Sequence, residues 1–205
     1  MAVLALVMYV VMFLVVFVLR TTMQKRATGD SGIRAGVLRA SPGSLEWVAG
    51  WVLVLALVAG LVAPMAELAG LDPLVRTGWV RATGAAIAAV GILSTFVAQT
   101  DMGAEWRIGV DGDERTGLVT DGAFRLVRNP VFSAMIVSAI GLAVMVANPI
   151  AILGAIALVA AIELQVRFVE EPHLRNLHAD DYPAYASRVG RFVPGLGRLR
   201  VDARR

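Results

Sequence analysis

The sequence contains no cysteine, which excludes disulfides, thiolate nucleophiles and cysteine-ligated metal sites. Its two histidines, His173 and His178, are too few for a histidine-rich metal site. Charged residues make up 17% of the 205 residues, fewer than the roughly 25% of a soluble domain. The basic residues are not interleaved with aromatic ones, so the pI of 9.9 does not indicate nucleic-acid binding. What remains is a chain that is 58% hydrophobic with a mean hydropathy of +0.71, which indicates an integral membrane protein.

Five apolar segments predict an all-α membrane protein with five transmembrane helices. In chain order they are residues 1–19, 47–66, 82–100, 131–147 and 150–163. The first has neither a basic start nor a small-residue cleavage site, so we expect a retained helix rather than a signal peptide. The last two are short, and Asn148-Pro149 between them is a tight-turn signal. They therefore predict a helical hairpin, not one long span.

Basic residues in the loops predict the orientation of the chain. Residues 20–46 carry five lysines and arginines, residues 101–130 carry four arginines, and eight more arginines lie from Arg167 onward. Residues 67–81 carry two, and the hairpin turn has none. We expect the N-terminus outside and the C-terminal region on the cytoplasmic side of the membrane. Residues 1–100 then form three helices with a basic cytoplasmic loop, and residues 101–205 form a core whose helical hairpin spans 131–170.

This topology brings the residues before the hairpin and those after it to one cytoplasmic mouth. Glu163, Arg167, Glu170 and Glu171 are three or four residues apart and share a face if the helix is regular. They indicate either a helix end whose charges reach water or a polar pocket that grips a charged ligand. We favour the pocket.

Arg128-Asn129-Pro130 opens the fourth helix, with Asn129 expected as its cap and Pro130 in its first turn. The triplet can be purely structural. A helix N-terminus also suits a carboxylate, so a zwitterionic amino-acid group would fit between it and the charges after the hairpin. Beyond these charges, residues 182–193 read as an amphipathic helical cap that ends at Pro194-Gly195.

Two separated motifs make the sequence resemble a known family. Residues 118–124 and 128–132 resemble the Leu-Val-x-x-Gly-x-Tyr and Arg-His-Pro-x-Tyr signature of the isoprenylcysteine carboxyl methyltransferases. The later Glu170-Glu171-x-x-Leu174, the pair Tyr182 and Tyr185, and Arg191-Phe192-x-Pro194 resemble its C-terminal signature. The likeness covers residues 99–195, and indicates a bacterial member of this family or of the related phospholipid methyltransferases. Asn129 replaces the usual histidine, and Phe124 and Phe132 replace tyrosines.

The resemblance implies an S-adenosylmethionine-dependent methyltransferase that acts on a lipophilic or lipid-linked acceptor entering from the bilayer, expected at a carboxylate. The implied cofactor-binding residues are Leu118, Val119, Phe124, Arg128, Asn129, Pro130, Phe132, Glu170, Glu171 and His173. Arg167, Glu170 and Glu171 are the implied catalytic residues, with Arg167 facing the acceptor. Two alternatives remain at this point: a membrane reductase of the sterol-reductase type that uses NADPH, and a non-catalytic membrane scaffold descended from the methyltransferases.

Overall fold

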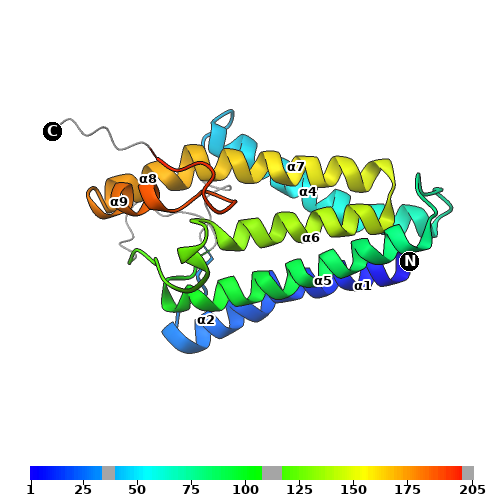
Figure 1. Ribbon diagram of the computed structural model, residues 1–205, viewed down its shortest axis with the longest axis horizontal. Helices are drawn as coiled ribbons and strands as arrows, with labels where there is room; N and C mark the ends of the chain where they lie inside the picture. Colours follow the sequence, from blue (N-terminus) through cyan, green and yellow to red (C-terminus); the bar gives the residue numbers. More distant parts are fainter. Residues whose placement is uncertain (34–39, 108–116, 200–205) are drawn as a thin grey trace.

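The computed structural model describes residues 1–33, 40–107 and 117–199, and these residues form an all-helical bundle (Figure 1). Four helices are long and apolar enough to cross a membrane: Ala2–Thr28, Leu45–Leu68, Gly78–Asp101 and Pro149–Leu177. A fifth apolar helix, α6 (Pro130–Val146), has 17 residues, at the lower limit for a bilayer. The all-α membrane fold is thus confirmed, with four candidate spans. Arg34, Arg39 and Arg115, which entered the orientation argument, lie outside the described residues.

The first helix runs well past the predicted end of its apolar segment at residue 19. It consists of α1 (Ala2–Phe13), a π-helical stretch (Leu14–Leu19) and α2 (Arg20–Thr28), and it ends at Gly29 with a φ of 78°. Arg20, which follows this apolar segment, does not reach water. The side chain is buried, and its guanidinium donates to the carbonyls of Gln99 and Gly103. These contacts hold the first helix against the end of α5.

Small residues let the long helices approach closely. Helix α5 (Gly78–Asp101) packs along α6, and α4 (Leu45–Leu68) packs along α7 (Pro149–Gln165). A Cβ on Gly84 would lie 2.5 Å from the backbone nitrogen of Met145, and one on Gly91 would lie 2.5 Å from that of Ser138. Glycine is therefore required where α5 and α6 cross.

The predicted turn between α6 and α7 is confirmed. Ala147 ends α6 in the left-handed conformation, with a φ of 52°. Asn148 then caps α7, because its side-chain oxygen accepts from the backbone N–H of Ala151 at 2.9 Å. Its amide nitrogen donates to the Ala63 carbonyl at 2.8 Å, so the buried side chain also ties the turn to α4. The turn lies at the end of the bundle opposite α8 and α9 (Figure 1).

The chain beyond α7 differs from the prediction of one helical cap. Helix α7 continues without a break through a π-helical stretch (Val166–Glu170) and α8 (Glu171–Leu177), and α9 (Asp181–Arg188) follows. The predicted helix end at Pro194-Gly195 is wrong, because Val189 is already extended, with a ψ of 134°. Residues 189–199, here termed the C-terminal strap, run back across the start of α6.

Backbone hydrogen bonds join the strap to the segment before α6. The N–H of Arg128 donates to the Gly190 carbonyl at 2.8 Å, and that of Asn129 donates to the Arg191 carbonyl at 3.1 Å. A short 3-10 helix, η3 (Gly122–Arg125), lies just upstream. The prediction that the segments before and after the hairpin meet at one end of the bundle is therefore confirmed (Figure 1).

Candidate functional site

A cavity of about 280 Å³ opens where these segments meet. Its walls come from the π-helical part of the first helix, the start of α4, the end of α5, the start of α6, and the continuous helix from α7 to α8. Most of the lining is apolar, with a few polar side chains. The predicted site residues that line it are Phe124, Arg128, Asn129, Pro130, Phe132 and Glu170. Such a mixture is typical of a small-molecule site.

The N-terminus of α6 faces this cavity. Pro130 occupies the first turn of α6, and Val131 and Phe132 also line the cavity. The first N–H groups of a helix have no acceptor within it, so this wall carries donors and the positive end of the helix dipole. Asn129 does not cap the helix with its side chain as predicted. Its amide nitrogen instead donates to the Arg191 carbonyl of the strap, at 3.3 Å.

Arg128 forms a buried network that fixes the strap in place. Its Nη2 donates to Oε1 of Glu171 at 2.7 Å, and both side chains are at most 3% exposed. Its Nη1 donates to the carbonyls of Ala186, at 3.0 Å, and Val189, at 2.8 Å. Arg191 adds two bonds of 2.8 Å to Glu171 and has its pKa raised by that carboxylate. Arg175 lies 3.7 Å from the same carboxylate, so Glu171 is committed to three arginines, and it does not line the cavity.

The π-helical stretch decides which charges face the cavity. Arg167 is predicted to share a face with Glu170 on a regular helix, but a π-turn adds a residue to the turn and breaks that register. Glu170 lines the cavity next to Gln165, five residues earlier. Arg167 instead pairs with Glu163, and its side chain is 52% exposed. This geometry does not support a ligand-holding role for Arg167 in the cavity.

Aromatic side chains form the wall near the end of α5. Trp106 is 2% exposed and lines the cavity beside Phe124, and the Arg20 guanidinium lies 5.2 Å from the centre of the Trp106 ring. The Tyr185 hydroxyl donates to the Phe124 carbonyl at 2.6 Å. Burial raises the pKa of Tyr185 to about 12, so this donor keeps its proton at neutral pH. The position of Phe124 is therefore well defined.

Besides Glu171, three predicted cofactor residues lie outside the cavity lining. Leu118 packs against Tyr182 and Tyr185 of α9. Val119 and His173 are partly buried outside the cavity lining. The structure adds lining residues that the sequence did not single out as site residues. They are Val16, Phe17, Glu46, Gln99, Met102, Trp106, Arg107 and Gln165, with further apolar residues.

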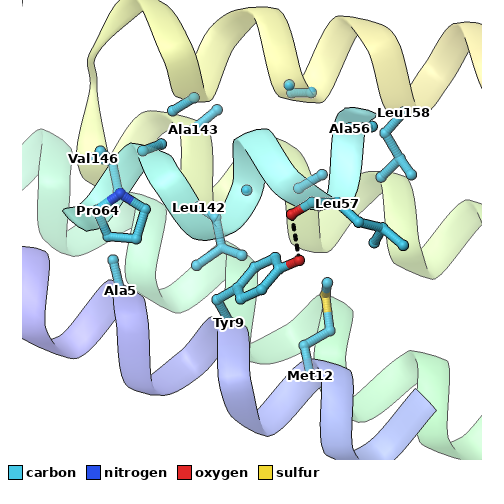
Figure 2. A pocket seen from close by; sticks show the side chains of 16 residues that line it. Ala5, Tyr9, Met12, Ala56, Leu57, Pro64, Leu142, Ala143, Val146 and Leu158 are labelled. Carbon is cyan, nitrogen blue, oxygen red and sulfur yellow. Dashed lines mark hydrogen bonds between the residues drawn. The ribbon is translucent and has the colours of Figure 1, made fainter. Parts of the chain in front are cut away.

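A second, smaller cavity of about 40 Å³ lies deeper in the bundle, between α1, α4, α6 and α7 (Figure 2). As far as the described residues show, its lining is apolar except for Tyr9, whose hydroxyl donates to the Leu57 carbonyl at 2.6 Å. Because that hydroxyl is already paired, this cavity has no free polar group to hold a ligand.

Comparisons with known proteins show which family the chain resembles. The family model of the phospholipid methyltransferases matches residues 79–181, half of the chain. Protein-S-isoprenylcysteine O-methyltransferases B and A of Arabidopsis thaliana are 25% and 28% identical over 142 residues, or 68% of this chain and 72% of theirs. The nickel-cobalt-cadmium resistance protein NccN of Alcaligenes xylosoxydans xylosoxydans is 28% identical over 120 residues, 58% of this chain and 55% of its own.

The matched region contains α5, α6, α7, the π-helical stretch after it and most of the cavity walls. The phospholipid methyltransferases are membrane enzymes that use S-adenosylmethionine. From the family match and the membrane bundle together, the chain belongs to the phospholipid methyltransferase family.

Proposed function

We propose that this protein transfers a methyl group from S-adenosylmethionine to a lipophilic acceptor, and that the 280 Å³ cavity is the site. The observation that carries the proposal is the pairing of a helix N-terminus with a carboxylate across one cavity. The α6 N-terminus offers N–H donors, and Glu170 offers an acceptor. The amino-acid part of the donor carries one charge of each sign, so the residues present fit it.

Each wall has a role in this proposal. The N–H groups at the start of α6 would hold the donor's carboxylate, and Glu170, supported by Gln165, would hold its ammonium group. Phe124, Phe132 and Trp106 offer surfaces for a flat base. The bound donor supplies a methyl group on a positively charged sulfur. These side chains then contribute orientation, which for an in-line displacement is worth up to roughly 7–11 kcal/mol.

The acceptor is proposed to be a lipophilic molecule that enters from the bilayer. An acceptor carboxylate, with a reference pKa of about 4, is already ionised and needs no general base. An amine acceptor would need one, and Glu170 is the candidate. Since Arg167 lies outside the cavity and pairs with Glu163, the carboxylate acceptor loses the cation that was predicted to hold it. An assay that compares methyl transfer to a carboxylate and to an amine distinguishes the two acceptors.

The proposed topology places this cavity on the cytoplasmic side. In this topology α6 counts as a fifth crossing. The described basic residues Lys25 and Arg26 belong to α2, which lies at the same end of the bundle as the strap (Figure 1). That excess of positive charge supports a cytoplasmic location, with the N-terminus outside.

Calorimetric titration with S-adenosylhomocysteine, the demethylated product, tests the proposal. We expect saturable binding to the detergent-purified protein and an affinity about tenfold lower in Glu170→Gln, since a charge-assisted bond contributes roughly 1.5–3 kcal/mol. The matched control is Glu163→Gln, which makes the same substitution two helical turns earlier, at a glutamate outside the cavity. Unchanged affinity in Glu170→Gln would remove Glu170 from the site. No binding to a folded wild-type protein would reject the proposed donor and favour a non-catalytic scaffold.

A further inference from the structure

The side chain of Gln99 presents a buried hydrogen-bond acceptor that the fold leaves unused. Gln99 lies near the end of α5, is 1% exposed and lines the large cavity. Its Oε1 is buried and has no hydrogen-bond partner in the part of the chain that the structure describes. An unpaired buried carbonyl costs roughly 1–3 kcal/mol. Such a group in a cavity wall indicates a ligand that supplies the missing donor.

Contacts around Gln99 fix the orientation of its amide. Its Nε2 donates to the Val16 carbonyl in the π-helical part of the first helix, at 3.1 Å. A carbonyl accepts and cannot donate, so the nitrogen must point to Val16 and the oxygen must point away. Arg20 holds the backbone of the same residue, because its Nε donates to the Gln99 carbonyl at 3.1 Å. The side chain is therefore held with its unpaired acceptor directed away from Val16.

The neighbours of Gln99 define the kind of group it would receive. Trp106 and Phe17 also line the cavity, and Met102 lies one turn after Gln99. The carboxyl group of Glu170 and the amide of Gln165 line the cavity from the continuous helix that begins with α7, which lies on the other side of α6 from α5 (Figure 1). An acceptor set among aromatic and apolar side chains suits the exocyclic amine of a flat nitrogen heterocycle better than a fully charged group.

We infer that Gln99 Oε1 accepts a hydrogen bond from the exocyclic amine of the donor's adenine, and so selects adenine at this site. This rests on the proposed function, because it assigns the adenine end of the same ligand. It also gives the first helix a part in recognition, since the Val16 carbonyl and Arg20 set the orientation of Gln99. Those residues lie outside the region that matches the family.

The test compares two ligands that differ at the proposed bond. S-Inosylhomocysteine carries a carbonyl oxygen where S-adenosylhomocysteine carries the amine, so two acceptors would face each other. We expect the wild-type protein to bind the inosyl compound at least about tenfold more weakly, because a buried acceptor is then left unpaired. In Gln99→Met, which keeps the length of the side chain and removes the acceptor, this preference should fall to about twofold or less.

Gln24 provides a matched control. It is also fully buried, donates through Nε2 to a backbone carbonyl (that of Ala104, at 2.7 Å) and has an unpartnered Oε1, but it does not line the cavity. Gln24→Met should keep the full preference for the adenosyl ligand. Equal binding of both ligands by the wild type, which needs no variant to fold, overturns the inference and leaves the proposed donor intact. So does an undiminished preference in Gln99→Met. Binding of neither ligand by the wild type rejects the proposed function itself.

Discussion

Replacing Arg128 by methionine should destabilise the protein and release the C-terminal strap. The guanidinium donates hydrogen bonds to the carboxylate of Glu171 and to the carbonyls of Ala186, Val189 and Gly197, the last at 3.2 Å. Methionine has similar length but supplies none of these donors. The substitution therefore removes the donor to the carbonyls of Val189 and Gly197, which both belong to the strap. The Ala186 carbonyl still accepts from the N–H of Leu199.

The size of the effect follows from the burial of the pair. Removing one partner of a buried ion pair costs roughly 3–5 kcal/mol. Glu171 keeps its two bonds to Arg191, so we expect the lower end, about 3 kcal/mol. In a chain of this size 1 kcal/mol corresponds to roughly 2–4 °C, which gives a fall in Tm of about 6–12 °C. Tryptophan fluorescence during heating in detergent measures it.

Arg125→Met is the control for this prediction. Arg125 also pairs with an acidic residue, Asp121, but their side chains are 74% and 81% exposed. An exposed pair contributes little, so this variant should unfold within about 0.5 kcal/mol of the wild type. Trypsin should cut the strap faster in Arg128→Met than in Arg125→Met. Equal Tm values and equal cleavage rates for the two variants would refute the structural role given to the buried network.

Three further predictions follow from the packing, the tyrosines and the topology. Gly91→Ala should destabilise the protein by roughly 1–3 kcal/mol in thermal unfolding, since its Cβ would overlap α6, whereas Gly78→Ala meets no atom within 4 Å and should be neutral. Stability should fall as the pH rises from about 10, where tyrosine ionises in the unfolded chain, to about 12, the raised pKa of Tyr185 in the folded protein, and Tyr185→Phe should flatten this fall. Because the chain has no cysteine, Leu71→Cys and Leu126→Cys give unique labels, which an impermeant maleimide should reach from opposite sides of the membrane.

The sequence was sufficient for the membrane helices and for the meeting of the two ends of the hairpin. Both follow from strong, local signals: long apolar runs, and an Asn148-Pro149 turn that folds α7 back along α6. The match to the phospholipid methyltransferases then confirms the resemblance read from the motifs around Asn129 and Glu170. The predicted count of five crossings is not confirmed, because α6 is short enough to fall at the limit of what hydropathy can resolve.

The walls of the site were harder to predict because partners far apart in sequence set them. Glu171 looks like a ligand-binding acid in the sequence, yet Arg128 and Arg191 neutralise it from 43 and 20 residues away. Gln99 and Trp106 were passed over, because a single amide or indole carries no pattern of its own. Their importance appears only when the first helix is placed beside them.

The π-helical stretches explain why regular helical periodicity did not predict which residues line the cavity. Each of the two, Leu14–Leu19 and Val166–Glu170, contributes lining residues to the cavity. A regular helix through residues 163–171 would carry Arg167 and Glu170 on one face, and the sequence gives no sign that the register shifts between them. The shift separates a solvent-facing pair, Glu163 and Arg167, from an inward-facing acid, Glu170. The charge that meets the ligand is therefore set by local helix geometry as well as by residue type.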